Sequence, residues 1–220
     1  MIKLSNLTKE YKKPHKVILD KVSLTIDDNE FVAIMGKSGA GKSTLLNILG
    51  CIDLASSGEY QYDDTIVSNL SKKETHLFRK KHFSYVFQNF ELIPQYTVYE
   101  NVELPLLARN ISNKKEKVCK ALEDVGILEH KQKKINKLSG GEQQRCAIAR
   151  AIVAETDVIL ADEPTGSLDE QTSSEIMALL KELHKQGKTI IIVTHDIDIA
   201  NQCERCITIK DGKIISEISE

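Results

Sequence analysis

The chain has 220 residues, of which 41% are hydrophobic and 28% are charged. These values are typical of globular proteins and exclude a disordered, collagen-like or fibrous chain. The 30 basic and 32 acidic residues give a formal net charge of −2, so there is no overall positive field to hold a nucleic acid. The length allows one large domain, or a core with a subdomain.

No stretch of the sequence is suited to cross a membrane. The uncharged stretches, such as 43–52 and 189–195, fall well below the ~18 apolar residues that a spanning helix needs. The N-terminus carries charges without an apolar segment between them, which does not fit a secretory signal. We therefore expect a cytoplasmic protein with reduced cysteines. The CxxC pair Cys203 and Cys206 lacks the second pair of a four-ligand zinc site, so a structural role is expected.

In chain order, the first predicted elements are strands. Apolar and polar residues alternate over roughly the first 30 residues and again over 58–64, which predicts an antiparallel sheet. The short, nearly all-apolar runs 32–35, 158–161 and 190–193 predict strands that are buried on both faces of a parallel sheet. The β-branched residues of 206–209 predict one more strand.

Helical patterns separate these strands. Residues 112–126 are predicted to form an amphipathic helix with Ser112 as its N-cap and Gly126 at its end. A second helix is predicted over 174–187, where apolar residues recur at helical spacing. Residues 90–155 as a whole are predicted to be mostly helical. We therefore expect an α/β core made from both ends of the chain, with a helical subdomain inserted between them.

A phosphate-binding loop is the strongest motif. Residues 36–43 satisfy G-x-x-x-x-G-K-[ST], between a strand predicted over 31–35 and a helix predicted over 44–49. The glycines let the backbone curl so that N–H groups and the helix N-terminus point at phosphate oxygens. Lys42 is then expected to reach the β- and γ-phosphates, and the Ser43 hydroxyl to bind Mg²⁺.

Two acidic residues follow the apolar run that begins at Val158. Asp162 is expected to hold Mg²⁺, directly or through water, and Glu163 to polarise or deprotonate the attacking water. Acids after a strand are often only a solvated loop. The phosphate-binding loop makes the catalytic interpretation the stronger one, because both motifs would meet at the same edge of the sheet.

A second anion site is predicted at the start of another helix. Residues 138–142, Leu-Ser-Gly-Gly-Glu, precede an apolar helix, so Ser139, Gly140 and Gly141 offer exposed N–H groups. The alternative is an ordinary helix N-cap, which this pattern forms more often.

In this order, the motifs resemble those of the nucleotide-binding subunit of ATP-binding-cassette (ABC) transporters, and the resemblance covers 1–220. Residues 36–44 match the Walker A loop, 138–142 the signature sequence, and 158–163 Walker B with its catalytic glutamate. Single residues match the adenine-stacking aromatic, the Q-loop glutamine, the D-loop aspartate and the switch histidine: Tyr11, Gln88, Asp169 and His195, respectively.

The resemblance implies an ATPase with ATP and Mg²⁺ at its site. The implied nucleotide-binding residues are Tyr11, Gly36, Lys37, Ser38, Gly39, Ala40, Gly41, Lys42, Ser43, Thr44, Ser139, Gly140, Gly141 and Asp169. The implied metal ligands are Ser43, Gln88 and Asp162, and the implied catalytic residues are Glu163, His195 and Gln88. Each single residue also has an ordinary alternative: Tyr11 as packing in an edge strand, Gln88 as a strand-end amide, and His195 as a helix-capping or core histidine.

The resemblance also implies a fold and partners. The fold is an α/β RecA-like P-loop core, about 1–89 and 156–220, with an antiparallel β subdomain and an inserted helical subdomain, about 90–155, in one domain. The implied partners are a transmembrane permease and a second copy in an ATP-dependent head-to-tail homodimer, at the inner face of the cell membrane. Neither nucleic-acid binding nor direct membrane insertion is expected. DNA-repair relatives need a long coiled-coil insertion and translation relatives carry tandem cassettes, and neither feature occurs in this sequence.

The stretches 87–94, 100–105 and 161–169 are similar to those of the macrolide-exporter and lipoprotein-releasing branch. That similarity implies export or extraction of a peptide, antibiotic or lipoprotein-like substrate. An importer ATPase and a cell-division type regulator remain as alternatives. Residues 90–99 combine several aromatic and aliphatic side chains, and we expect them to line the groove that receives a short cytoplasmic helix of the permease.

Overall fold

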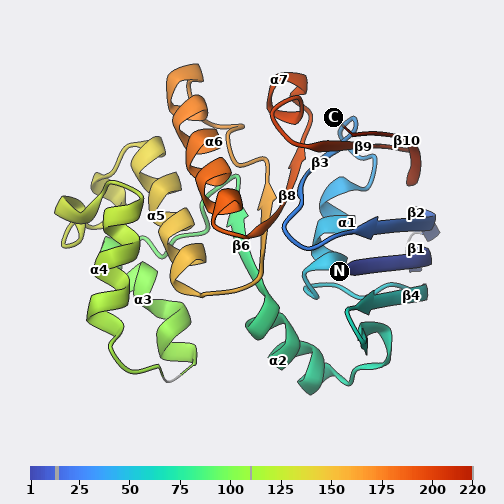
Figure 1. Ribbon diagram of the computed structural model, residues 1–220, viewed down its shortest axis with the longest axis horizontal. Helices are drawn as coiled ribbons and strands as arrows, with labels where there is room; N and C mark the ends of the chain where they lie inside the picture. The colour runs from blue at the N-terminus through green and yellow to red at the C-terminus, as the bar shows by residue number, and fades with distance from the viewer. Residues whose placement is uncertain (13–14, 110, 220) are drawn as a thin grey trace.

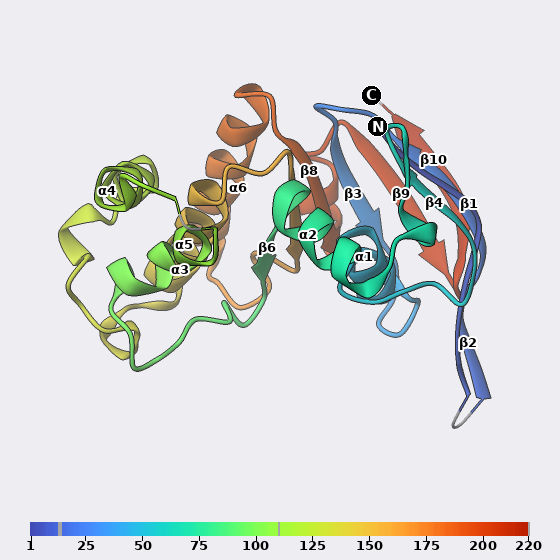
Figure 2. The same cartoon turned by 90° about the horizontal axis from the view of Figure 1, so that it is seen from below.

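The structure, a computed structural model, describes residues 1–12, 15–109 and 111–219 (Figure 1). Two β-sheets face each other across helix α1 (Lys42–Leu49) (Figures 1 and 2). Helix α2 (Lys72–His82) packs on the same side as α1, whereas the helices within 98–185 lie on the far side of the larger sheet or at its end. This arrangement confirms the predicted α/β class.

The smaller sheet is antiparallel, as the alternating pattern predicts. Its strand order is β2-β1-β4-β5, with β1 Ile2–Lys12, β2 His15–Ile26, β4 Ser57–Tyr62 and β5 Thr65–Ile66. In β1 the side chains of Ile2 and Leu4 are buried while Lys3 is exposed, because successive side chains of a strand point to opposite faces.

The larger sheet contains the predicted buried strands. Its order is β10-β9-β3-β8-β7-β6, with β3 Phe31–Met35, β6 Phe83–Phe87, β7 Val158–Asp162, β8 Thr189–Thr194, β9 Arg205–Lys210 and β10 Lys213–Ser219. All neighbours are parallel except β9 and β10. The register places Met35 beside Thr194, and Asp162 beside Val193, so the carboxyl ends of β3, β7 and β8 lie together.

The central strands β3, β7 and β8 of the larger sheet are buried on both faces, whereas the edge strand β10 is largely exposed. In β3, Phe31 and Ala33 join the hydrophobic core under α5 and α6, whereas Val32 and Ile34 join the core that contains α1 and the smaller sheet. This double burial explains why the sequence of β3 is apolar at every position. Each fully buried aliphatic side chain of this kind stabilises the fold by about 1.5–3 kcal/mol.

The helices α3, α4 and α5 follow one another between β6 and β7 and form the predicted helical subdomain (Figure 1). The helices after α1 are α2 Lys72–His82, α3 Val98–Ala108, α4 Lys114–Asp124, α5 Gly140–Val153, α6 Glu170–Lys185 and α7 Ile197–Ala200. Short 3₁₀ turns occur at Val67–Asn69, Leu128–His130 and Ile135–Lys137.

Three predicted helix boundaries were wrong. Ser112 is not the N-cap of α4, because Asn113 adopts a left-handed conformation (φ 58°) and the helix cannot begin before Lys114. Helix α6 begins at Glu170 rather than at 174, because the Asp169 carboxylate accepts a hydrogen bond from the Thr172 backbone N–H at 2.9 Å and caps the helix. The helix of the phosphate-binding loop begins at Lys42 rather than at 44.

The five cysteines are free thiols. Within the described residues, no group of three or more His, Cys, Asp or Glu side chains could hold a metal ion. None of the described helices is both long enough and apolar enough to span a bilayer.

Candidate functional site

A cavity of about 1080 Å³ opens at the carboxyl ends of β3, β7 and β8. It brings together the predicted Gly36, Lys37, Ser38, Gly39, Gly41, Lys42, Ser43, Thr44, Gln88, Asp162, Glu163 and His195. The aligned strand ends explain the convergence, because in an open parallel sheet the loops that follow neighbouring strands meet at one edge.

The loop 36–43 wraps around the Lys42 ammonium. Lys42 Nζ donates to the carbonyl oxygens of Gly36 at 2.7 Å and Lys37 at 3.3 Å. Gly41 (φ 104°) precedes α1, and a Cβ atom there would lie 2.9 Å from the Ile18 carbonyl oxygen, so only glycine fits. No side chain caps α1 among the described residues, and its first residues line the cavity, so its first N–H groups are available to an anion there.

Ala40 is the exception within the loop. Its side chain is buried in the core around α1, and it does not line the cavity. The Ala40 side chain therefore packs in the core, while its neighbours in the loop line the cavity, and a nucleotide contact of Ala40 stays a prediction.

Ser43 and Asp162 form the oxygen-rich side of the cavity. The Ser43 hydroxyl donates to Asp162 Oδ1 at 3.2 Å. Burial raises the pKa of the Asp162 carboxyl and the neighbouring Glu163 charge adds to this, although the Ser43 hydrogen bond and Lys42 act against it. A hydroxyl, a carboxylate and the Gln88 amide at one cavity are the hard oxygen donors that Mg²⁺ prefers.

Glu163 has an unusual backbone conformation. Its φ is +47°, a left-handed value that costs energy for a residue with a side chain. Its N–H donates to the Val193 carbonyl at 2.9 Å. Its carboxylate accepts from His195 Nδ1 at 2.8 Å and from the Thr194 hydroxyl at 3.4 Å. The residues at the end of β8 thus aim the Glu163 carboxylate at the cavity.

Gln88 lies directly after β6, beside the loop that follows Glu163. Its backbone carbonyl accepts from the Ser167 hydroxyl at 3.3 Å. A Cβ atom at Gly166 would lie 2.9 Å from Gln88 Nε2. The Q-loop glutamine and the acidic loop are therefore packed against each other.

The structure does not bring Tyr11 to the cavity. Its hydroxyl donates to Asp53 Oδ2 at 3.2 Å, and Lys9 Nζ lies 5.1 Å from the ring centroid. Burial opposes ionisation of Asp53, but the hydrogen bonds from Lys9, Leu54 N–H and Tyr11 outweigh it and lower the Asp53 pKa. Stacking of Tyr11 on adenine stays a prediction.

The signature residues also lie away from the cavity of their own chain. Ser139 N-caps α5: its hydroxyl accepts from the Glu142 N–H at 3.3 Å, and its own N–H donates to Glu142 Oε2 at 2.6 Å. The backbone hydrogen bond from Ser139 lowers the pKa of Glu142. Within one chain, the ordinary capping role is therefore the one that Ser139 fulfils.

Gly140, Gly141 and Asp169 form a packed junction between α5 and α6. A Cβ atom at Gly141 would lie 2.6 Å from Thr172 Cγ2, whereas one at Gly140 would make an ordinary 3.5 Å contact with Leu168. The Asp169 carboxylate accepts from the Thr172 hydroxyl at 2.7 Å. These three predicted residues lie outside the cavity as well.

Sequence reasoning missed the far wall of the cavity. Lys16 and Ile18 of β2, Asn201 after α7, Cys206 and Thr208 of β9, and Ile218 of β10 line it. The β9 residues arrive because β9 pairs with β3, Ala33 beside Cys206 and Met35 beside Thr208. That pairing leaves no periodic or motif signal in the sequence.

A second cavity, of about 650 Å³, lies among α2, β6, α3 and α5. Its lining includes one acidic side chain, Glu91, and five basic ones: His76, Arg79, Lys80, Arg109 and Arg150. Of the segment 90–99, Glu91 lines this cavity and Tyr96 is exposed.

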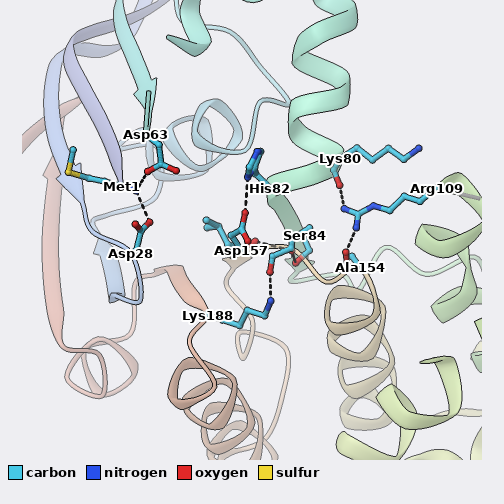
Figure 3. Close-up of polar contacts among 12 residues, drawn as sticks. Met1, Asp28, Asp63, Lys80, His82, Ser84, Arg109, Ala154, Asp157 and Lys188 are labelled. Carbon is cyan, nitrogen blue, oxygen red and sulfur yellow. Dashed lines mark hydrogen bonds and ion pairs between the residues drawn. The ribbon is translucent and has the colours of Figure 1, made fainter. Parts of the chain in front are cut away.

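The three arginines of this second cavity donate hydrogen bonds to backbone carbonyls. Arg79 donates to Cys51 O at 2.9 Å, and Arg150 to Glu91 O at 2.6 Å. Arg109 contacts the carbonyls of Lys80 and Ala154 (Figure 3). Burial lowers the pKa of Arg109 and Arg150. Within the described residues, no carboxylate forms an ion pair with Arg79, Lys80, Arg109 or Arg150.

Comparison with known proteins identifies relatives of the whole chain. Residues 19–166 match the family model described as ABC transporter. The chain is 47% identical to the ABC transporter ATP-binding protein MJ0796 of Methanocaldococcus jannaschii, over 99% of this chain and 96% of that protein. It is 44% identical to the macrolide export ATP-binding/permease protein MacB of Hyphomonas neptunium, over 99% of this chain but 34% of that longer protein.

Solved structures agree with the observed fold. The dimeric structure of MJ0796 superimposes with a TM-score of 0.92 at 44% identity, over 100% of this chain and 98% of that one. A second MJ0796 structure, described as a dimeric post-hydrolysis state bound to ADP and Pi, also gives a TM-score of 0.92, at 43% identity and with the same coverage.

Proposed function

This chain belongs to the ABC transporter family as an ATP-binding subunit and ATPase, and from that premise we propose that it hydrolyses ATP to drive a permease that is a separate chain. The observation that carries the proposal is the meeting of Lys42, Asp162 and Glu163 at one cavity. A phosphate-binding cation, a metal-binding carboxylate and a general base are the groups that hydrolysis of a phosphoanhydride needs.

In this proposal Glu163 acts as the general base. Its carboxylate takes a proton from the water that attacks the γ-phosphorus, and ADP leaves with the electron pair of the broken P–O bond. His195, 2.8 Å from the Glu163 carboxylate, holds that carboxylate and hydrogen-bonds the γ-phosphate. Lys42 and the N–H groups of α1 stabilise the negative charge of the phosphates.

The site also fits Mg²⁺. Ser43 and Asp162 already contact each other at 3.2 Å and Gln88 lines the same cavity, so these three would hold the ion. A bound Mg²⁺ neutralises charge on the β- and γ-phosphates. The raised pKa of Asp162 supports this role, because a buried carboxylate that lacks a full counter-charge gains from a cation.

A head-to-tail homodimer completes the site. The signature loop lies outside the cavity of its own chain, yet Ser139 to Gly141 begin a helix whose N-terminus suits an anion. In the proposed dimer, this loop covers the ATP that is held by the partner's Lys42. The dimeric state of the related MJ0796 cassette supports the arrangement.

We place the permease contact at the second cavity and the adjoining segment 90–99. The cavity is lined by five basic side chains and a single acidic one. Partly buried cations that contact backbone carbonyls and have no ion-pair partner among the described residues favour an anionic partner. We therefore expect a permease helix with acidic side chains to lie there, at the inner face of the cell membrane.

The similarity to MacB, a macrolide export protein, supports an export role. We propose export or extraction of a peptide, antibiotic or lipoprotein-like substrate. An importer, or a non-transporting complex of the cell-division type, would use the same ATPase chemistry. Purification of the chain from its native membranes discriminates these functions: a co-purifying permease with few spans and a large external domain supports export, whereas association with a solute-binding protein system supports import.

Glu163→Gln tests the hydrolytic role directly. The substitution keeps the shape of the side chain but removes the base, so phosphate release is expected to fall on the order of 10² to 10⁴-fold while ATP binding persists. Glu182→Gln, an exposed position on α6, is the control and should retain wild-type turnover. Near wild-type turnover of Glu163→Gln would remove Glu163 from the catalytic role.

A further inference from the structure

Gln144, in the second turn of α5, is completely buried. Its side-chain Nε2 donates a hydrogen bond to the Pro164 carbonyl at 2.6 Å. Pro164 lies outside the helical subdomain. Pro164 directly follows Glu163. The amide thus connects the helix that begins with the signature loop to the loop that carries the general base.

The other end of this amide has no partner. Within the described residues, no donor lies within hydrogen-bond distance of Gln144 Oε1. A buried acceptor without a partner costs free energy; an apolar side chain of the same shape would avoid that cost but would leave the Pro164 carbonyl without its donor. A glutamine at this position is therefore a poor choice for packing alone.

The loop that Gln144 holds is conformationally strained. Glu163 has φ +47°, and its carbonyl accepts from the Gly166 N–H at 3.1 Å to close a turn. The Pro164 carbonyl belongs to this turn, so its direction and that of the Glu163 backbone are coupled. A left-handed residue persists only where its surroundings hold it in place.

We propose that Gln144 is a positioning residue that holds the Pro164 carbonyl and thereby keeps the Glu163 carboxylate aimed at the nucleotide cavity. Through this link, the orientation of α5 determines whether Glu163 is placed to receive a proton. The inference rests on the proposed hydrolytic role of Glu163, and it adds a residue that touches neither nucleotide nor water.

The test compares Gln144→Met with Gln143→Met in the full-length chain. Gln143 lies in the same helix and donates from Nε2 to the Leu138 carbonyl at 3.1 Å, within its own subdomain, so it is the matched control. For Gln144→Met we expect kcat per folded chain to fall at least 10-fold and ATP affinity to stay within about 2-fold. The unfolding midpoint should fall slightly, because the Pro164 carbonyl loses its donor. Gln143→Met should leave all three unchanged.

A second variant supplies a chemical rescue. In Gln144→Glu, a protonated carboxyl can donate to the Pro164 carbonyl, whereas an ionised one repels it, and burial favours the protonated form. The ratio of its kcat to that of the wild type should therefore rise several-fold when the pH falls from 8.5 to 6.5. The same ratio for Gln143→Glu should stay flat.

Three results would overturn the inference: an unchanged kcat in Gln144→Met, a kcat that falls only in proportion to lost folded protein, or a pH-independent ratio for Gln144→Glu. Failure of the proposed function is separable, because it would appear as an active Glu163→Gln chain whatever the Gln144 variants do.

Discussion

The Ser43 hydroxyl donates to Asp162 Oδ1 at 3.2 Å, which joins the phosphate-binding loop to the end of β7. The phosphate-binding loop and the strand that carries the proposed metal ligand thus share a direct polar contact. Asp162 nevertheless has a raised pKa, because burial outweighs the Ser43 and Lys42 contributions.

The raised pKa of Asp162 predicts a stability cost at neutral pH. The folded chain holds this proton more tightly than the unfolded chain, so the group favours folding below its ordinary pKa, and that contribution is lost as the pH rises through the folded-state value. Asp162→Asn removes the ionised carboxylate. Without nucleotide, it should therefore raise the unfolding midpoint at pH 7.5 by about 2–4 °C for each kcal/mol of stability gained. The rise should be smaller at pH 4, where more of the wild-type carboxyl is protonated.

The same variant should lose stabilisation by ligand. Thermal unfolding with and without Mg²⁺ and ATP should show a smaller ligand-dependent rise for Asp162→Asn than for the wild type, since a ligand stabilises only the state that binds it. An Asp162→Asn midpoint below that of the wild type at pH 7.5 would contradict the stability cost.

Tyr11 offers a test between two roles. Its ring contacts Lys9 and Asp53 rather than the cavity, whereas the family resemblance predicts stacking on adenine. If stacking occurs on binding, Tyr11→Phe keeps ATP affinity, and Tyr11→Ala weakens it about 10-fold, since base stacking contributes about 1–3 kcal/mol. Equal affinities for Tyr11→Ala and the wild type, by fluorescent-nucleotide titration, would assign Tyr11 to packing.

The shared-site dimer predicts complementation between two single variants. Lys42→Ala should impair phosphate binding, and Gly140→Asp should place a carboxylate against the partner's γ-phosphate. Gly140 is preferable to Gly141, because a Cβ at Gly141 collides with Thr172 of the same chain while one at Gly140 does not. Mixed single variants place both lesions in one site and leave the other site intact, so ATP-dependent association should partly return.

A chain that carries both substitutions supplies the control. Mixed with wild-type chain, it places one lesion in each site and should not recover association, as measured by light scattering or size-exclusion chromatography. The shared site would be refuted if the mixed single variants associated no better than either variant alone while the wild-type chain dimerised normally with ATP.

The basic second cavity predicts a charge-dependent permease contact. Lys80→Glu reverses one charge of the cavity lining, and should reduce co-purification of the permease from membranes at least several-fold while ATP binding persists. Lys115→Glu, at an exposed position of α4, is the matched control. If Lys80→Glu recovered as much permease as the wild type, the permease contact would not lie at this cavity.

Much of the nucleotide site could be predicted from local signals. The spacing of glycines, Lys42 and Ser43, and the apolar strand that ends in Asp162 and Glu163, are properties of short segments, and the structure brings them together because parallel strands end at one edge. The double burial of β3 follows from its all-apolar sequence in the same way.

Other features depended on information that the local sequence does not contain. The left-handed Asn113 shifted the start of α4 because its conformation depends on its surroundings, not on helix periodicity. Thr208 reaches the cavity through a strand pairing with no motif of its own. Gln144 resembles any other glutamine in a helix until its burial and its bond to Pro164 are known.

The position of β3 has a consequence for synthesis of the chain. Its partners in the sheet, β8 and β9, lie about 160 to 175 residues later, since Val32 pairs with Ile191 and Arg205. Contacts between residues so far apart in sequence form late in folding, because closing a long loop costs entropy before the contact can stabilise the chain. A ribosome-bound chain therefore presents the apolar Phe31–Met35 without its partner strands until β8 and β9 have been made. We therefore expect chaperones to bind this apolar segment during synthesis, and we expect chains that stop before β8 to be degraded.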